Sequence, residues 1–364
     1  MIPKQRTWRR AVLGCAVFGL AAGLSAFAAA QEREVRAVNW GGAMMDAHLA
    51  LFYGPFTKAT GIKVVADTWS GKISQIRAMV EAKSISKDMF VVNPWDAVQG
   101  CDEGILERID PKKDLGLSDA DVKDFYEGAI EPCGVATDIW TYVWSWDRAR
   151  HPEWTEATGP KNIKDIYDVK KWPGKRGIGK RAYMNLEMAL QADGVSNKDM
   201  YKVLATEEGV KRAFAKFDQI KPHAVWWTAT PQQAQFLADG VSDLQHIVGA
   251  RWFDAKVNHK KDFVPMWYGQ MYSYNMWSVA KGTPRRQESM DLLKFMLKPD
   301  GLAKQAEMVA YAPARKSALK LVKAELQPQM PTAHFGDDTL YLSAQFWTER
   351  LDAYTKRFEA WLGK

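Results

Sequence analysis

Tryptophan side chains gather at the ends of short apolar segments in this sequence. The chain holds 16 tryptophans, and several of them fall where a predicted strand ends: Trp40, Trp95, Trp226, Trp227 and Trp277. Ligands of open α/β sheets lie at strand ends, and flat rings there can enclose a small molecule or stack on a cation. Any one of these rings could instead pack in a core. Their shared position favours an aromatic-lined cleft.

Motifs that would support catalysis or a metal site are not complete. The run Gly174 to Arg181 fits a phosphate loop except at its last position, where Arg181 replaces the hydroxyl that would hold magnesium. No apolar strand precedes its glycines, so we exclude nucleotide hydrolysis. The six histidines are scattered and form no metal-binding spacing, and no Gly-x-Ser-x-Gly elbow is present. We therefore expect no cofactor, no metal and no enzymatic activity.

The N-terminal 30 residues have the pattern of an export signal. Four basic residues precede the uncharged apolar stretch 11–27, and three alanines at 28–30 offer a cleavage site. A loose twin-arginine pattern at Arg9-Arg10 and a faint lipobox at Cys15 are alternatives, but Cys15 lies too near the start of the stretch. We predict a signal peptide at residues 1–30 and a periplasmic protein.

The remaining 334 residues suit two lobes. Removing the four basic residues of the signal lowers the formal charge from +7 to +3. This mild, dispersed excess predicts no nucleic-acid partner. Two cysteines remain, Cys101 and Cys133, and an oxidising compartment permits a disulfide between them. Two buried free thiols are the alternative.

Strands alternate with amphipathic helices in the first third of the mature chain, which predicts an α/β fold with a largely parallel sheet. Strands are expected at 34–40, 61–67 and 89–92, with helices at 47–59 and 73–83 between them. The region 151–177 is rich in Pro, Gly and charge, which indicates a surface connection. Further helices are expected at 183–193, 207–220, 231–238 and 287–297, and the last 60 residues are expected to be mainly helical.

Aromatic residues occupy every second position from Trp140 to Trp146. This period of two predicts a strand that carries Trp140, Tyr142, Trp144 and Trp146 on one face. Such a face suits either a core layer or a strand that crosses between two lobes beneath a cleft. A second crossing strand is predicted at 272–279.

Several segments together resemble the spermidine/putrescine-type solute-binding proteins of ABC importers. They include Trp172-Pro173-Gly174-Lys175-Arg176, the run Leu186 to Val195, Val225-Trp226-Trp227, Gly249-Ala250-Arg251 and Tyr311-Ala312-Pro313. The similarity extends from about residue 35 to residue 331. It implies a two-lobed type II periplasmic-binding fold with hinged lobes that close on a ligand, and a membrane permease as partner. We expect a monomer.

The crossing strands would divide the chain into two lobes. Lobe 1 is predicted to comprise residues 31–138 and about 275–300, and lobe 2 to comprise residues 139–274 and about 301–364. The two strands near Tyr142 and Tyr274 would then be the crossovers.

The resemblance also implies a ligand site. Trp40 matches an aromatic that packs on the ligand, and Trp95 lies where the family places another. Asn275 and Gly42 stand where polyamine binders carry acids, and Arg181 falls in the stretch that supplies a third acid. The ligand site is predicted to comprise Trp40, Gly41, Gly42, Trp95, Arg181, Trp226, Trp227, Arg251, Tyr274 and Asn275.

Loss of those carboxylates changes the expected ligand. A buried ammonium without a carboxylate costs several kcal/mol, and an aromatic face returns only about 0.5–2 kcal/mol. Arg181 and Arg251 near the cleft favour a ligand with an acidic group, such as an amino-acid-like zwitterion or an organic acid. A true putrescine or spermidine binder, with Asp96 or Asp138 restoring the site, is one alternative. A secreted α/β enzyme that uses the aromatic cleft is another, and a ligand-binding module that docks on a chemoreceptor is a third.

Overall fold

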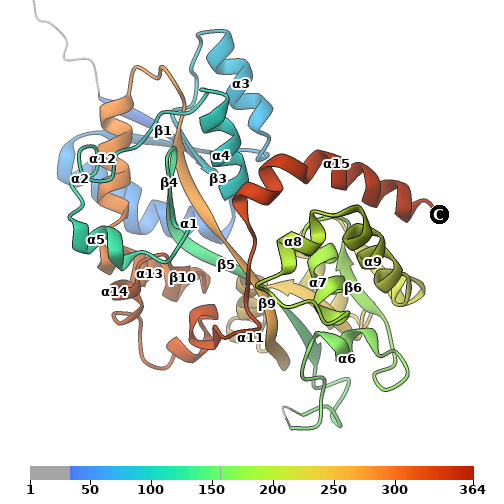
Figure 1. Ribbon diagram of the computed structural model, residues 1–364. Coiled ribbons are helices and arrows are strands. Elements are labelled where there is room, and N and C mark those ends of the chain that lie inside the picture. Colours follow the sequence, from blue (N-terminus) through green and yellow to red (C-terminus); the bar gives the residue numbers. More distant parts are fainter. Residues whose placement is uncertain (1–32, 156) are drawn as a thin grey trace, which may run out of the picture. The chain divides into compact units, whose positions relative to one another are not determined.

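The computed structural model describes residues 33–155 and 157–364. The predicted signal peptide at 1–30 therefore lies outside the described residues. Within the described part of the chain, no helix is both long enough and apolar enough to cross a membrane. Strands and helices alternate (Figure 1), which confirms the predicted α/β class.

The first three strands form a parallel group. Strand β1 (Glu34–Asn39) pairs with β2 (Lys63–Thr68) on one side and β3 (Met89–Val92) on the other. The predicted helix at 47–59 begins earlier and includes one π-helical turn. The connecting helices are α1 (Ala43–His48), η1 (Leu49–Tyr53), α2 (Gly54–Thr60), α3 (Ile73–Glu81), α4 (Pro94–Asp102) and α5 (Asp119–Asp124).

Two long strands join this group to the rest of the sheet. Strand β5 (Gly134–Asp147) pairs antiparallel with β9 (Phe263–Val279), and Ile139 lies opposite Tyr274. The sheet has the order β2-β1-β3-β9-β5-β8-β6-β7. Because β9 runs antiparallel to both β3 and β5, the sheet is mixed at its centre. The prediction of a largely parallel sheet is wrong there, since the crossing strands return through the middle of the sheet.

A second parallel group follows β5. Strand β6 (Arg176–Gly179) pairs in parallel with β7 (Ala224–Trp227) and with β8 (Leu244–Val248). The phosphate-loop-like run thus contains a strand. The predicted helix at 231–238 is confirmed as α10. The helices of this region are α6 (Ile163–Tyr167), α7 (Asn185–Ala192), α8 (Met200–Leu204), α9 (Glu207–Asp218), η2 (Lys221–His223), α10 (Pro231–Ala238) and α11 (Gly249–Val257).

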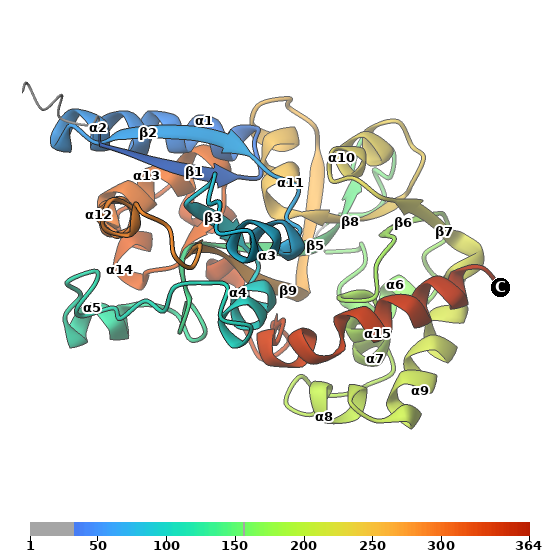
Figure 2. The same cartoon turned by 90° about the horizontal axis from the view of Figure 1, so that it is seen from above.

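The C-terminal residues are mainly helical, as predicted. The last helix, α15 (Ala344–Leu362), begins beside α4 and continues beside α8 and α9 (Figure 2). Thr348 donates to the carbonyl of Trp95 in α4, and Trp347 Nε1 donates to the buried Glu187 of α7. The remaining elements are β4 (Ile130–Glu131), α12 (Arg286–Met296), α13 (Pro299–Val309), β10 (Ala312–Pro313), α14 (Lys316–Leu319), η3 (Gln327–Gln329), η4 (Pro331–His334) and β11 (Leu340–Tyr341).

Two separate hydrophobic clusters form the interior. One contains β1, β3 and the first residues of β5, such as Val135 and Ile139. The other contains the aromatic face of β5, which confirms that Trp140, Tyr142, Trp144 and Trp146 share one side of a strand. A strand that enters both clusters is the arrangement expected of a crossover. The residue ranges predicted for the two lobes remain a prediction.

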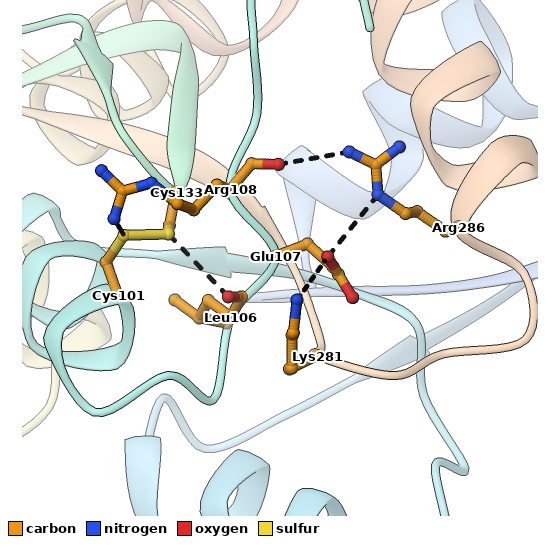
Figure 3. Close-up of a disulfide and its surroundings, with 7 residues drawn as sticks. All are labelled: Cys101, Leu106, Glu107, Arg108, Cys133, Lys281 and Arg286. Carbon is orange, nitrogen blue, oxygen red and sulfur yellow. Dashed lines mark hydrogen bonds and ion pairs between the residues drawn. A yellow bond between two sulfur atoms is a disulfide. The ribbon is translucent and has the colours of Figure 1, made fainter.

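Cys101 and Cys133 form a disulfide between α4 and the start of β5 (Figure 3). The bond joins residues 32 positions apart. The prediction of this pairing is therefore confirmed. Nearby, Glu107 lies between the cations of Lys281 and Arg286 and holds the loop after α4 against the start of α12 and the residues before it.

The region 151–177, predicted to be a surface connection, has many exposed residues and also a buried part. Trp154 and Trp172 are buried within it. The guanidinium of Arg176 is fully enclosed and donates to the carbonyls of Ile166, Gly174 and Trp172 at 3.0, 2.7 and 2.5 Å. The Pro/Gly-rich loop folds around this cation because its free carbonyls need a donor.

Candidate functional site

A cavity of about 420 Å³ lies where the crossing strands meet the loops at the ends of β1, β3, β6 and β8. This position agrees with the rule that ligands of α/β sheets lie at strand ends. Its lining comes from segments far apart in the sequence: Trp40, Gly41, Ala43, Met44, Asn93, Trp140, Tyr142, Arg181, Tyr183, Met184, Thr230, Val248, Ala250, Arg251, Phe253, Asp254, Asn258, Asn275, Met308, Val309 and Tyr311.

Arg181 is held in place by the loop between β6 and α7. The side chain of Asn185, the first residue of α7, donates to the carbonyls of Gly179 and Arg181 at 2.8 and 2.6 Å. Met184, the residue before α7, has a positive φ of 68°, which a non-glycine residue rarely adopts. The loop therefore directs Arg181 toward the cavity by its backbone shape.

Aromatic rings surround the guanidinium of Arg181. Its central carbon lies 4.4 Å from the ring centroid of Tyr142, 4.6 Å from that of Trp227 and 4.9 Å from that of Tyr183. The Nη1 atom donates to the hydroxyls of Tyr142 and Tyr183 at 3.3 and 3.4 Å. These contacts are the cation–π and hydrogen-bonding interactions expected of arginine in an aromatic site.

Arg181 nevertheless has unused hydrogen-bonding capacity. Its Nε and Nη2 atoms are buried and have no hydrogen-bond partner. Within residues 33–155 and 157–364, no carboxylate forms an ion pair with this guanidinium. A buried charge without a counter-charge costs several kcal/mol, so this site is electrostatically incomplete without an anion.

The opposite wall of the cavity is a hydrogen-bonded group on β1, β9 and β5. Trp40 Nε1 donates to Asn275 Oδ1 at 2.8 Å, and Asn275 Nδ2 donates to Asp138 Oδ1 at 2.6 Å. Trp40 also stacks on Trp69, with ring centroids 5.8 Å apart. Gly41 follows with φ of 78°, and a Cβ there would lie 2.9 Å from Thr68. The turn after β1 therefore requires glycine at this position.

The structure brings Trp40, Gly41, Arg181, Arg251 and Asn275 together around the cavity. Of the other predicted residues, none lines it. Trp95 is buried against Tyr183, with ring centroids 5.3 Å apart. Gly42 precedes α1, where it caps the helix. Trp95 and Gly42 therefore contact or adjoin lining residues but do not line the cavity themselves.

Three further predicted residues lie outside the cavity lining, and strand alternation explains their positions. Tyr274 is fully buried on the face of β9 opposite Asn275, and its hydroxyl donates to the carbonyl of Glu127 at 2.6 Å. Trp227 is buried behind Arg181, and Trp226 faces away, against Phe217 and Trp361. Trp227 supports the site because it packs on Arg181, whereas Trp226 and Tyr274 face away from the cavity.

Several lining residues are absent from the predicted site. Tyr142 belongs to the predicted aromatic face of β5, and this face could have identified it. Asp254 lies three residues after Arg251 on α11 and is therefore on the same side of that helix. Tyr183 and Asn93 give no signal in the sequence that distinguishes them from core residues, and Tyr311 appears only in a segment that carries the family resemblance.

Asp254 is the one carboxylate among the described residues that line the cavity, and its side chain is 43% exposed. It accepts a hydrogen bond from Asn258 Nδ2 at 2.7 Å. Asp96 and Asp138 do not line the cavity, and they lie behind Asn93 and Asn275. Within the described chain, no cluster of three His, Cys, Asp or Glu residues is arranged to hold a metal ion.

Residues 53–332 match the family model described as bacterial extracellular solute-binding protein. The chain is 35% identical over 349 residues to the gamma-aminobutyric acid-binding protein of Pseudomonas aeruginosa, with 96% of each chain covered. The chain belongs to the bacterial extracellular solute-binding proteins. The resemblance to solute-binding proteins is thereby confirmed.

Other members of this solute-binding family are more distant. The spermidine/putrescine-binding periplasmic protein of Escherichia coli is 21% identical, with 93% of this chain and 91% of that protein covered. Among solved structures, a GABA receptor superposes with a TM-score of 0.80 at 24% identity, covering 91% of this chain and 98% of that one. The PBP MotA from A. tumefaciens B6, in complex with glucopine, gives a TM-score of 0.77 at 26% identity, covering 90% of this chain and 99% of that one. These similarities confirm the predicted two-lobed periplasmic-binding fold.

Proposed function

We propose that this protein captures a small amino-acid-like zwitterion in the periplasm and delivers it, unchanged, to the permease of an ABC importer. A ligand such as gamma-aminobutyric acid carries one carboxylate and one ammonium group. The single observation behind this proposal is the buried guanidinium of Arg181, a residue of the cavity lining whose Nε and Nη2 atoms have no hydrogen-bond partner.

A carboxylate is the group that best completes this site. Two neighbouring donors of one guanidinium match the two oxygens of a carboxylate, and charge-assisted bonds of this kind are roughly twice as strong as neutral ones. The three rings around Arg181 exclude water and so strengthen the interaction. Arg251 at the same cavity adds a second positive charge.

The ammonium group of the ligand has acceptors on the other walls. Asp254 offers a carboxylate, Asn93 and Asn275 offer amide groups, and Trp40 offers an indole face. The name of the Pseudomonas aeruginosa relative agrees with a ligand that combines both charges. MotA is a structural relative that holds glucopine, so this fold accommodates ligands other than polyamines.

A polyamine ligand is the second candidate, supported by the names of the more distant relatives. It fits the cavity less well. Asp254 is the single lining carboxylate within the described residues, whereas Arg181 and Arg251 would both repel an ammonium group. Two or more ammonium groups would therefore be bound without sufficient counter-charge.

The mature protein should be tested with a ligand panel by thermal shift and calorimetry. Suitable ligands are 4-aminobutyrate, 5-aminovalerate, glutamate, succinate, putrescine and spermidine. A ligand that binds only the native state raises the melting temperature, and we expect the ω-amino acids to do so most. A shift with putrescine or spermidine alone would refute the proposal.

Ligand recovered chemically altered after incubation would favour the enzyme alternative, and binding without uptake in a transport assay would favour a sensory role. A monomer is expected by light scattering.

A further inference from the structure

Two asparagines in the cavity wall are each backed by a buried aspartate. Asn275 on β9 donates from Nδ2 to Asp138 Oδ1 at 2.6 Å. Asn93, which precedes α4, donates from Nδ2 to Asp96 Oδ2 at 3.0 Å. Both asparagines line the cavity and neither aspartate does. The cavity wall thus presents two neutral amides, and the side of each amide that faces away from the cavity is bonded to a carboxylate.

The Asn275–Asp138 pair is the more completely enclosed of the two. Asp138 is 1% exposed and accepts hydrogen bonds from Asn275, from Gln305 Nε2 at 2.9 Å and from Thr137 Oγ1 at 3.0 Å. Burial raises the pKa of Asp138 to about 6, and the three donors oppose that rise. Because all three neighbouring groups donate to its oxygens, the side chain acts here as an acceptor.

The accepting carboxylate of Asp138 determines which way the amide of Asn275 points. A carboxylate accepts hydrogen bonds and donates none, so it selects the NH₂ group of Asn275. The oxygen of the same amide must then face the other way, where it accepts from Trp40 Nε1 at 2.8 Å. An amide oxygen has two lone pairs, so Asn275 Oδ1 retains one acceptor position beside Trp40 at the cavity.

We propose that Asp138 is a positioning residue that turns the oxygen of Asn275 toward the ligand, and that this neutral oxygen determines which ligand charge the cavity accepts. An amide oxygen can accept one hydrogen bond from an ammonium group whose charge is balanced within the ligand by its own carboxylate. It lacks the full charge needed to hold a diamine. This inference rests on the proposed function and refines the class of ligand to molecules with an internally balanced charge.

The exchange variant Asp138→Asn/Asn275→Asp tests this inference. It keeps the atoms and the net charge of the pair, moves the carboxylate to the cavity wall and reverses the direction of the hydrogen bond between the two side chains. Calorimetry at pH 7.5 should use putrescine, 4-aminobutyrate and butyrate, which differ in charge and are similar in length. We expect putrescine to bind about ten-fold or more tightly than to wild type, and butyrate to bind more weakly.

The comparison variant is Asp96→Asn/Asn93→Asp, the same exchange on the other pair, and an equal gain in putrescine affinity there would overturn a special role of Asn275 and Asp138. Circular dichroism and the melting temperature should show that both variants fold. An equal change for all three ligands would indicate a structural role and overturn the inference. An unchanged putrescine affinity would also overturn it, whether or not wild type binds 4-aminobutyrate. Failure of wild type to bind any acid-bearing ligand would instead refute the proposed function.

Discussion

The guanidinium of Arg181 lies over the ring of Tyr142, 4.4 Å from its centroid, and donates to the hydroxyl of the same residue. One tyrosine thus provides both a π face and an acceptor to one cation. This contact occupies Nη1 and leaves Nε and Nη2 for another partner. The geometry is that of a prepared anion site: the cation is held rigidly before the ligand arrives, so less entropy is lost on binding.

Replacement of Arg181 should abolish tight binding. We expect Arg181→Ala to weaken 4-aminobutyrate binding by about 100-fold or more, because loss of one partner of a buried charge pair costs about 2–5 kcal/mol. Arg181→Lys should weaken it less, since one charge remains without the paired donors. Calorimetry measures both. Arg251→Ala, which removes a half-buried cation from the same cavity, is expected to cost less than about ten-fold, and an equal effect of both alanine variants would contradict a dominant Arg181.

The same residue should lower the stability of the unliganded protein. A buried charge without a counter-ion is unfavourable, and the surrounding rings offset only part of that cost. We therefore expect Arg181→Met to raise the melting temperature in the absence of ligand while removing the ligand-induced shift. Differential scanning calorimetry on thoroughly dialysed protein checks this. A lower melting temperature would show that the aromatic contacts alone compensate the charge.

The disulfide should contribute substantially to stability. It closes a loop between residues 32 positions apart, for which chain entropy gives roughly 3–4 kcal/mol. The variant Cys101→Ala/Cys133→Ala should therefore unfold at a lower urea concentration than wild type. Wild type treated with a reducing agent is the control for lost side-chain packing. Equal urea midpoints for the oxidised and reduced forms would contradict this prediction.

His48 should make the protein sensitive to acid. Its Nδ1 accepts from Asn39 Nδ2, since an amide nitrogen can only donate, and its Nε2 is buried without a partner. Burial lowers the pKa of His48 to about 3. The unfolded chain therefore takes up a proton below about pH 6.5 that the folded protein does not, and stability is lost as the pH falls from there toward 3.

The variant His48→Gln isolates this effect. Glutamine keeps an acceptor for Asn39 and cannot become charged. Between pH 6.5 and pH 4.5 wild type should lose roughly 2–3 kcal/mol more than the variant, because each pKa unit corresponds to about 1.4 kcal/mol. Urea unfolding at a series of pH values measures the difference. Parallel stability curves for the two proteins would show that His48 does not contribute.

Arg176 should be essential for the loop that precedes β6. Its guanidinium donates to three backbone carbonyls and is fully enclosed. We expect Arg176→Met to cost at least about 3 kcal/mol, since each bond to a charged group is worth roughly 1.5–3 kcal/mol. Arg212→Met is the control: its ion pair with Asp193 is 44% exposed on the arginine side and should contribute less than about 1 kcal/mol. If urea unfolding shows similar losses of unfolding free energy for the two variants, the proposed role of Arg176 is wrong.

Local features of the sequence were sufficient for much of the fold. The alternation of strands and helices, the helix at 231–238 and the aromatic face of β5 all follow from side-chain periodicity, which depends on residues close in the chain. The disulfide followed from having two cysteines in an oxidising compartment. Trp40 was found because it lies at the end of a predicted strand, whereas Arg181 and Asn275 were expected from the resemblance to the solute-binding family.

The tertiary structure alone decided which side of each strand faces the cavity. Asn275 and Tyr274 are neighbours, yet one lines the cavity and the other lies in the core, because β9 is fixed between β3 and β5 and alternate side chains point to opposite faces. The same reason separates Trp227 from Trp226. Tyr183, Asn93 and Asp138 reach the site through contacts between segments far apart in the sequence, and no local pattern encodes such contacts.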